Sequence, residues 1–369
     1  MKPHTVRSYR FVFVPAFVGG VLLALLVAAP LFGQSAALLP NSGAAPVYER
    51  LHHIAERYAP FIYHATDNTG GRQDIISNID FDGDLVGNNN WENFENYELK
   101  PTVYYAVLET ETHYFISFHL FHPRDWNHFT FYLHDTHEND GENFQVVVRK
   151  ADTAVVLLWT QAHYRSDVYT NPGSGIQSGK TTIAGQFQLV DDRGIPSETG
   201  THAAVFVEAQ GHGIYGTLDS SSEVVINADG SFAFEDGSGL LFRPALTGET
   251  VTEPAVFTSG EVPYQLDSIT MKLWHLLRDG TLVGDDKLLD GAVRYADELV
   301  SIDVPRYYDA NRFSGPFGAD RGISPFALDF SFSKGTLGAL FFNPAKRYDE
   351  QLTISDLWSK QYIQYPFAR

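Results

Sequence analysis

The sequence contains no cysteine and only two methionines among its 369 residues. Without cysteine the chain forms no disulfide and offers no thiol nucleophile, so an exported protein of this kind relies on its core, or on a bound metal, for stability. The sequence also lacks a Walker A loop, a G-x-S-x-G elbow, an H-E-x-x-H motif and a dinucleotide-binding glycine pattern. These absences leave several familiar enzyme classes without support.

Basic residues are scarce. The 26 Lys and Arg residues face 45 Asp and Glu residues, which gives a net charge of −19. A surface this acidic repels nucleic acid and anionic lipid, whereas it attracts divalent cations. We therefore expect no nucleic-acid partner.

The remaining composition is that of a globular protein, with 44% hydrophobic and 19% charged residues. Aromatic residues reach 14%, mostly Tyr and Phe, which favours pleated sheets over helical bundles. The sequence therefore predicts a mainly β protein with a full hydrophobic core.

The N-terminal segment has a basic head, a long apolar middle and an exit rich in small residues. This order is typical of a secretory signal peptide, which we predict over residues 1–35, followed by a flexible segment over 36–45. An uncleaved anchor helix is the alternative, because the apolar run approaches membrane-spanning length. Pro15 and Pro30 shorten that run. Cleavage is the favoured interpretation: it predicts a secreted or periplasmic protein with no stable membrane span.

Strand-like segments dominate the rest of the chain. Between residues 100 and 165, runs rich in β-branched and aromatic residues alternate with short polar turns, which leaves no room for crossover helices. Residues 46–60 have helical spacing, and Asp229-Gly230 predicts a hairpin. We predict an antiparallel β-sandwich, jelly-roll-like, with a few peripheral helices. It forms one domain over residues 46–369 with C-terminal decoration, because no Pro- or Ser-rich linker divides it.

The segment HDTHENDGENFQVVV combines imidazoles, carboxylates and a turn-like dipeptide. Asp140 and Glu142 are two residues apart, so on an extended strand both side chains point to the same side, and His137 precedes them closely. One imidazole and two carboxylates suit Mg²⁺ or Ca²⁺, with Zn²⁺ less favoured. The alternative is a plain hairpin turn over Asn139-Asp140-Gly141, because these residues tolerate positive φ.

Other polar residues border neighbouring strands, where a site between loops is built. Asp125 lies in HPRDWN, before the connection that leads to His137, and a hairpin would bring the two together. His163 ends a strand-like run, and His202 and His212 flank another. Asp125 is therefore a fourth predicted metal ligand, and His163 and His212 are the candidates for a catalytic base.

These elements together carry a resemblance. Residues 100–216 resemble the vacuolar-protein-sorting-associated family of the Vps sixty-two type, and more distantly they are similar to the necrosis-inducing, Nep-like secreted toxins. The shared pattern is H-x-x-D-x-E before a run of Val, matched by His137, Asp140 and Glu142. A Pro-basic-Asp element ending at Asp125, a strand end carrying His163, and the segment HAAVFVEAQGHGIYG complete it.

The resemblance implies a compact antiparallel β-sandwich with a divalent cation at one end. For the toxins it also implies membrane damage after binding a sphingolipid headgroup. This chain departs from them: their Asp-Trp-Glu is Asp140-Gly141-Glu142, their disulfide is impossible, and the chain is longer. We carry over the fold and the metal site, not the toxin activity.

A second acidic loop, NIDFDGDLVGNNNWEN, alternates Asp80, Asp82 and Asp84 around Gly83. Such a loop can wrap Ca²⁺, which takes six to eight oxygen ligands. It does not follow the EF-hand pattern, and the alternative is a surface loop held by side-chain-to-backbone turns.

Three functions stay open. The first is a secreted β-sandwich protein whose divalent cation recognises a glycan or lipid headgroup, or stabilises loops. The second is a secreted metal-dependent hydrolase, in which the ion lowers the pKa of a bound water and His163 or His212 acts as the base. The third is a structural or interaction module without chemistry.

Overall fold

The computed structural model describes residues 45–126, 137–163, 165–279, 288–289, 293–296, 301–304, 307–308, 328–331 and 338–367. The predicted signal peptide and flexible segment lie almost entirely outside these residues. Within them the chain is mainly β, as its composition predicted. No helix of the described part is long and apolar enough to span a bilayer.

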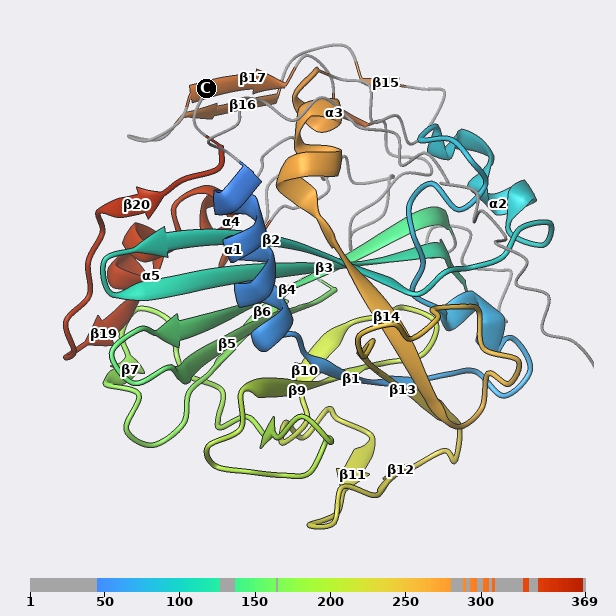
Figure 1. Cartoon of the computed structure of the whole chain (residues 1–369), viewed down its shortest axis with the longest axis horizontal. Coiled ribbons are helices and arrows are strands. Elements are labelled where there is room, and N and C mark those ends of the chain that lie inside the picture. The colour runs from blue at the N-terminus through green and yellow to red at the C-terminus, as the bar shows by residue number, and fades with distance from the viewer. Residues whose placement is uncertain are drawn as a thin grey trace, which may run out of the picture. The chain divides into compact units, whose positions relative to one another are not determined.

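Five consecutive strands form the antiparallel half of the main sheet (Figure 1). Each strand pairs with the next because short turns join most of them and their β-branched and aromatic residues suit a pleated, buried surface. These strands are β2 (Thr102–Thr110), β3 (His113–Asp125), β4 (His137–Arg149), β5 (Ala154–Ala162) and β6 (Arg165–Tyr169). The antiparallel pairing predicted for this region is confirmed.

The rest of the main sheet is mixed. Its order is β10-β9-β1-β13-β14-β2-β3-β4-β5-β6, and three neighbouring pairs are parallel: β1 with β9, β13 with β14, and β14 with β2. The purely antiparallel fold that we expected is therefore wrong for this half, because these strands are joined by long connections rather than tight turns. The added strands are β1 (Phe61–Ala65), β9 (His202–Val207), β10 (Ile214–Gly216), β13 (Gly239–Pro244) and β14 (Glu261–Ser268). The sandwich and single-domain descriptions stay predictions.

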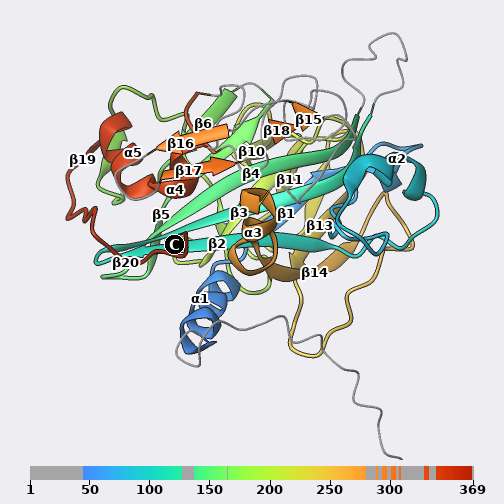
Figure 2. The ribbon, with the colours of Figure 1, turned by 90° about the horizontal axis from the view of Figure 1, so that it is seen from above.

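Helices cover both faces of the central strands (Figure 2). Helix α1 (Ala45–Arg57), which confirms the helix predicted there, lies on one face, where its His52 Nδ1 is 2.9 Å from the hydroxyl of Tyr105 in β2. On the other face lie α4 (Ala339–Phe342) and α5 (Pro344–Gln351), whose Tyr348 stacks on Phe115 of β3. Double coverage explains why every residue of β2 is buried.

The remaining elements decorate this frame. The Asp229-Gly230 hairpin is confirmed by β11 (Val224–Ile226) and β12 (Phe232–Phe234), and Gly230 takes the φ of 87° that such a turn requires. A π-helical turn, η3 (Ile269–Leu273), is followed by α3 (Trp274–Asp279). The others are η1 (Gly71–Asp74), η2 (Gly87–Asn89), α2 (Asn90–Asn93), β7 (Ile176–Ser178), β8 (Leu189–Val190), β15 (Leu288–Leu289), β16 (Val293–Ala296), β17 (Ser301–Val304), β18 (Tyr307–Tyr308), β19 (Leu352–Ile354) and β20 (Tyr362–Gln364).

Candidate functional site

The residues expected in a hairpin turn lie inside strand β4, so the turn interpretation of Asn139–Gly141 is wrong. The β3–β4 register places Asp140 opposite His122 and His137 opposite Asp125. Only Asn139 uses the positive φ that this tripeptide tolerates, at 60°, and strand pairing continues on both sides of it. The connection between β3 and β4 falls in residues 127–136, outside the described part, as does the side chain of His137.

The loop that contains three consecutive asparagines holds the start of β4 in place. Asn139 Nδ2 donates to the carbonyl of Gly87 at 2.6 Å, and Asn90 donates to Asn139. The backbone N–H of Trp91 donates to Glu138 Oε2 at 2.7 Å. Buried polar groups on β4 are thus paired with η2 and α2, which fixes the strand beside them.

Asp140 and Glu142 are both buried, and their spacing of two residues places them on the same side of β4, as the sequence predicted. Neither oxygen of Glu142 has a hydrogen-bond partner among the described residues. Burial, followed by the negative charges of Asp140, Glu208 and Asp125, raises the pKa of Glu142 well above its ordinary value. We call these four acidic residues the carboxylate cluster.

The carboxylate cluster meets solvent on the side of Glu208 and His163. The side chain of His163 is 47% exposed and that of Glu208 is 27% exposed. They form a close ion pair, and this hydrogen bond outweighs burial and raises the pKa of His163. The hydroxyl of Tyr215 donates to the other oxygen of Glu208 at 3.4 Å. His163 thus stands at the rim of the cluster.

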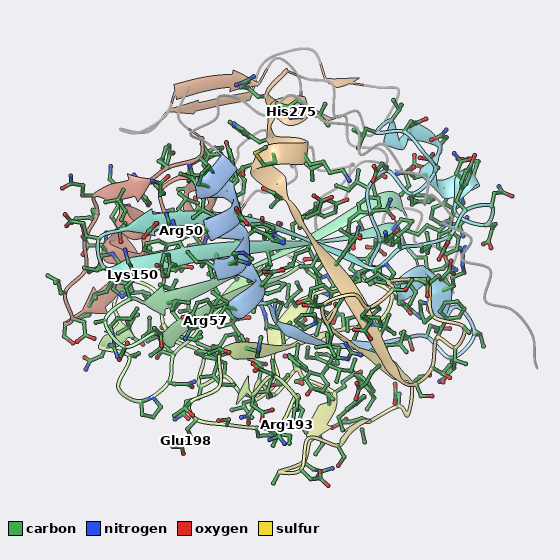
Figure 3. All side chains as sticks on the ribbon, viewed as in Figure 1. Arg50, Arg57, Lys150, Arg193, Glu198 and His275 are labelled. Carbon is green, nitrogen blue, oxygen red and sulfur yellow. The ribbon has the colours of Figure 1, made fainter. Side chains whose placement is uncertain are left out.

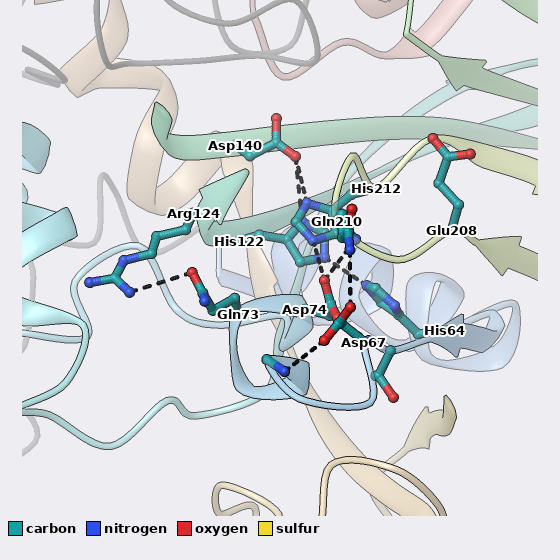
Figure 4. A network of polar contacts seen from close by, with 12 residues as sticks. His64, Asp67, Gln73, Asp74, His122, Arg124, Asp140, Glu208, Gln210 and His212 are labelled. Carbon is teal, nitrogen blue, oxygen red and sulfur yellow. Dashed lines mark hydrogen bonds and ion pairs between the residues drawn. The ribbon is translucent and has the colours of Figure 1, made fainter. Parts of the chain in front are cut away.

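His212 lies on the buried side of the cluster, between two carboxylates (Figure 4). Its Nδ1 is 2.8 Å from Asp140 Oδ2, and its Nε2 is 3.2 Å from Asp74 Oδ1. Burial by itself lowers the pKa of His212, but the hydrogen bonds and charges of Asp140 and Asp74 prevail and raise it to about 10. A fully buried imidazolium between two buried carboxylates is an ion triad, which fits a structural role better than that of a solvent-facing base.

Two further histidines, which sequence reasoning did not single out, complete the network. His122 stacks on His212 with ring centroids 3.8 Å apart, and His64 Nε2 is 3.0 Å from His122 Nε2. Burial, then the charge of His212, lowers the pKa of His64 to about 4, and the same two causes hold the pKa of His122 well below its ordinary value. Both rings are therefore neutral at physiological pH.

The curvature of the sheet brings these residues together. β10, at one end of the strand order, also packs against β5, near the other end. Hence His64 of β1 and His212, just before β10, meet His122 of β3. A signal was present in the sequence: His64 interrupts the otherwise apolar strand FIYHA, where a buried polar side chain requires a partner.

His202 and the second acidic loop, both singled out in the sequence, do not contribute to the carboxylate cluster. His202 is in β9, where its Nδ1 is 2.6 Å from the carbonyl of Ala59. In the second acidic loop, each carboxylate has its own partner: Asp80 faces Lys272 Nζ, Asp82 accepts from Asn93 Nδ2, and Asp84 accepts from the backbone N–H of Val86. These contacts fit the surface-loop alternative, and calcium binding there stays a prediction.

Comparisons with known proteins give a restricted result. No protein-family model matches the chain, and no curated protein matches it. Solved structures that match include one described as "Toxin fold for microbial attack and plant defense", with 17% identity over 45% of this chain and 68% of that chain and a TM-score of 0.28. "NLPPya in complex with glucosamine" has 16% identity over 46% and 68%, also with a TM-score of 0.28.

A third is the necrosis and ethylene inducing protein 2 from the causal agent of cocoa's witches' broom disease, with 14% identity over 44% of this chain and 67% of that chain and a TM-score of 0.26. The structural neighbours are thus Nep-like toxins, whereas nothing supports the vacuolar-protein-sorting-associated family. Since every TM-score quoted is below 0.3, we base no functional argument on these neighbours.

Proposed function

We propose that the chain is an exported protein that binds a divalent cation at the carboxylate cluster of Asp125, Asp140, Glu142 and Glu208. The observation that carries this proposal is Glu142, a fully buried carboxylate whose two oxygens have no partner among the described residues. A buried carboxylate is costly unless it is paired, protonated or bound to a metal. The carboxylates of Asp140, Glu208 and Asp125 add to the cost of a charge on Glu142, which a cation bound beside it would lower.

The donor set favours a hard ion. Carboxylate oxygens are preferred by Mg²⁺ and Ca²⁺, whereas Zn²⁺ sites usually include nitrogen or sulfur. His137 stays in the proposal as a ligand, because its backbone lies opposite Asp125 in the β3–β4 register. The proposed hard-ion ligands are therefore Asp125, His137, Asp140 and Glu142, to which Glu208 is added.

The partly exposed rim gives the ion a function beyond stabilising loops. His163 and Glu208 reach solvent, so an ion beside Glu142 can keep coordination positions open on that side. Hydroxyl or phosphate oxygens of a glycan or a lipid headgroup are suitable ligands for such positions. We infer recognition of a headgroup of this kind, with no nucleic-acid partner because the chain is strongly acidic.

Metal-dependent hydrolysis is the alternative function. It is supported by the position of His163 at the solvent-exposed rim of the carboxylate cluster. This imidazole is half exposed and is oriented by Glu208 through its Nε2, so in its neutral form it can accept a proton from a metal-bound water. A His163→Gln variant that still binds the cation but no longer hydrolyses ester or glycoside model substrates would favour this alternative. If wild type hydrolyses such a substrate and His163→Gln hydrolyses it equally fast, His163 is excluded as the base.

The central test is calorimetric titration of the chelator-treated protein with Ca²⁺ and with Mg²⁺. Wild type should bind one equivalent of at least one ion, and Glu142→Gln should weaken binding at least about tenfold, because it removes one charged ligand. Glu198→Gln is the matched control, since that Glu is exposed at the edge of the fold (Figure 3).

The same variant also tests the energetic argument. Glu142→Gln keeps the side-chain shape and removes a charge that burial disfavours, so the metal-free variant should be at least as stable as wild type in urea denaturation. Unchanged Ca²⁺ and Mg²⁺ binding in Glu142→Gln would contradict the proposed site, and so would failure of wild type to bind either ion.

A further inference from the structure

A second group of buried residues, beside the carboxylate cluster, brings three histidine ring nitrogens close together. Among the described residues, His64, His122 and His212 each offer a ring nitrogen, and these three nitrogens lie within 4.8 Å of one another. All three side chains are fully buried. They come from β1, from β3 and from the segment before β10, so the fold, rather than one local motif, assembles them.

A carboxylate stands at the same place. Asp74, the last residue of η1, lies with its Oδ1 3.2 Å from His212 Nε2 and is itself fully buried. Its two oxygens accept backbone N–H groups of Asp67 at 2.7 Å and of Gln210 at 2.8 Å, which fix the orientation of the carboxylate.

The outer nitrogens of His64 and His212 have the partners that metal-bound histidines have. His64 Nδ1 is 2.6 Å from the carbonyl of Ala65, which only accepts, so Nδ1 carries the hydrogen and the neutral ring presents a lone pair at Nε2. His212 Nδ1 donates to Asp140 Oδ2 at 2.8 Å. A carbonyl or carboxylate behind the ring is the usual outer shell of a ligating histidine.

One ring nitrogen of His122 lacks a hydrogen-bond partner within the described part of the chain. His122 has one ring nitrogen directed at the lone pair of His64 Nε2, whereas its Nδ1 has no hydrogen-bond partner among the described residues and lies 4.0 Å from Asp140 Oδ2. A buried histidine that faces another ring nitrogen on one side, and a carboxylate beyond hydrogen-bonding distance on the other, cannot satisfy both of its nitrogens with hydrogen bonds.

We propose that His64, His122, His212 and Asp74 form a second metal site, selective for a borderline ion such as Zn²⁺. The two contacts of 3.0 and 3.2 Å are close to the ~3.3 Å that separates neighbouring ligands of a tetrahedral ion with bonds of ~2.0 Å. Three imidazoles and one carboxylate are a zinc-type donor set, unlike the all-carboxylate cluster next to it. This proposal does not depend on cation binding at Glu142.

Charge and backbone geometry support the assignment. Asp74 and Asp140 both contact His212, so the single positive charge of a protonated His212 is shared by two carboxylates, whereas a divalent ion supplies two positive charges. Gln210 and His212 adopt positive φ values of 71° and 53°, which non-glycine residues rarely adopt. Such strain is found mainly where the fold must place a side chain at a functional site.

The competing occupant is a proton shared by His212 and the two carboxylates, and metal uptake distinguishes the two. The chelator-treated protein is dialysed against Zn²⁺ or Co²⁺ and analysed by elemental mass spectrometry. Wild type should retain one equivalent, and the Co²⁺ form should show the intense visible absorption of four-coordinate cobalt. Absence of retained metal, or the weak spectrum of six-coordinate cobalt, overturns the proposal.

Variants locate the ion. His64→Gln and His122→Gln should each weaken Zn²⁺ retention at least about tenfold, since loss even of an outer-shell partner has that effect. His119→Gln is the matched control, because His119 is an equally buried histidine of β3 whose Nδ1 bonds to Asn143, outside the group. If both site variants, folded by circular dichroism, retain Zn²⁺ as well as the control does, the assignment is wrong.

The two sites are separated by one further comparison. Glu142→Gln should lose Ca²⁺ or Mg²⁺ and keep Zn²⁺, whereas His64→Gln should lose Zn²⁺ and keep the hard ion. If only Glu142→Gln departs from this result, the proposed function is contradicted. If only His64→Gln departs from it, the histidine site is contradicted. If a site variant does not fold, the cobalt spectrum of wild type still decides the coordination.

Discussion

Replacing His212 by Asn should destabilise the metal-free protein by about 3–5 kcal/mol, the cost of removing one partner from a buried ion pair. His212 lies between Asp74 and Asp140, and all three side chains are buried. Without the imidazolium, two carboxylates keep their burial cost and lose the charge that both of them share. Asn is the informative substitution, because it tolerates the φ of 53° that position 212 adopts.

The matched control for this variant is His163→Asn. His163 has nearly the same backbone conformation, with a φ of 52°, and it is also paired with a carboxylate, but its side chain is half exposed. An exposed pair contributes about 0–1 kcal/mol, so this variant should change stability little. Urea denaturation in the presence of a chelator measures both values. Equal losses in the two variants would show that the backbone, and not the buried charge, sets the cost.

The difference between these two histidines could not be read from the sequence. Both border strands, and both were candidate bases on that ground alone. Burial separates them: β10 packs against β5, which encloses His212, while His163 stays at the rim. Burial of this kind depends on contacts between segments far apart in the chain, which a local pattern does not encode.

What the sequence did predict follows from local periodicity. The β-branched and aromatic runs predicted strands between residues 100 and 165, where β2, β3 and β5 lie, and the period of two placed Asp140 and Glu142 on one face of β4. The turn signal at Asn139-Asp140-Gly141 was misleading, since pairing with β3 prevailed over the local tolerance for positive φ. Tertiary pairing routinely overrides such propensities.

His64 and Asp74 were missed for a related reason. Each lies in a short segment with no motif around it. The residues that surround them are brought together only by the pairing of β9, β1 and β13 and by the curvature of the sheet. The parallel pairing of β1 with β9 joins segments about 140 residues apart. The resemblance could not supply them either, because it begins near residue 100.

Acidification should begin to destabilise the metal-free protein before its exposed carboxylates titrate. Burial is the main cause that lowers the pKa of His64, His113 and His119, each to about 4 from an ordinary 6.5. Below pH 6.5 the unfolded chain takes up protons that the folded protein refuses, so stability falls with pH until about pH 4. Each such histidine costs about 3 kcal/mol over this window, since one pKa unit is worth about 1.4 kcal/mol.

Together the three are expected to remove about 10 kcal/mol, which is most or all of the stability of an ordinary domain. His212 does not oppose this loss: its pKa is raised to about 10, so its contribution is complete below pH 6.5 and disappears only as the pH rises towards 10. Glu142 offsets part of this loss, because its raised pKa lets the folded protein take up a proton before the unfolded chain does, whereas the lowered pKa of His122 adds to the loss. We expect the histidines to prevail, so that stability falls from neutral pH towards pH 4. Urea denaturation across a pH series, with a chelator present, measures this profile.

A pair of variants identifies the groups responsible. His119→Gln removes one refused proton, so it should flatten the acid side of the profile by up to about 1.4 kcal/mol per pH unit. His53→Gln is the control, because His53 lies on the exposed face of α1 with 67% of its side chain exposed. A stability that stays flat as the pH falls from 6.5 towards 4 would mean that these imidazoles accept protons in the folded state. The closed packing around these three histidines would then be wrong, because water or a counterion would have to reach them.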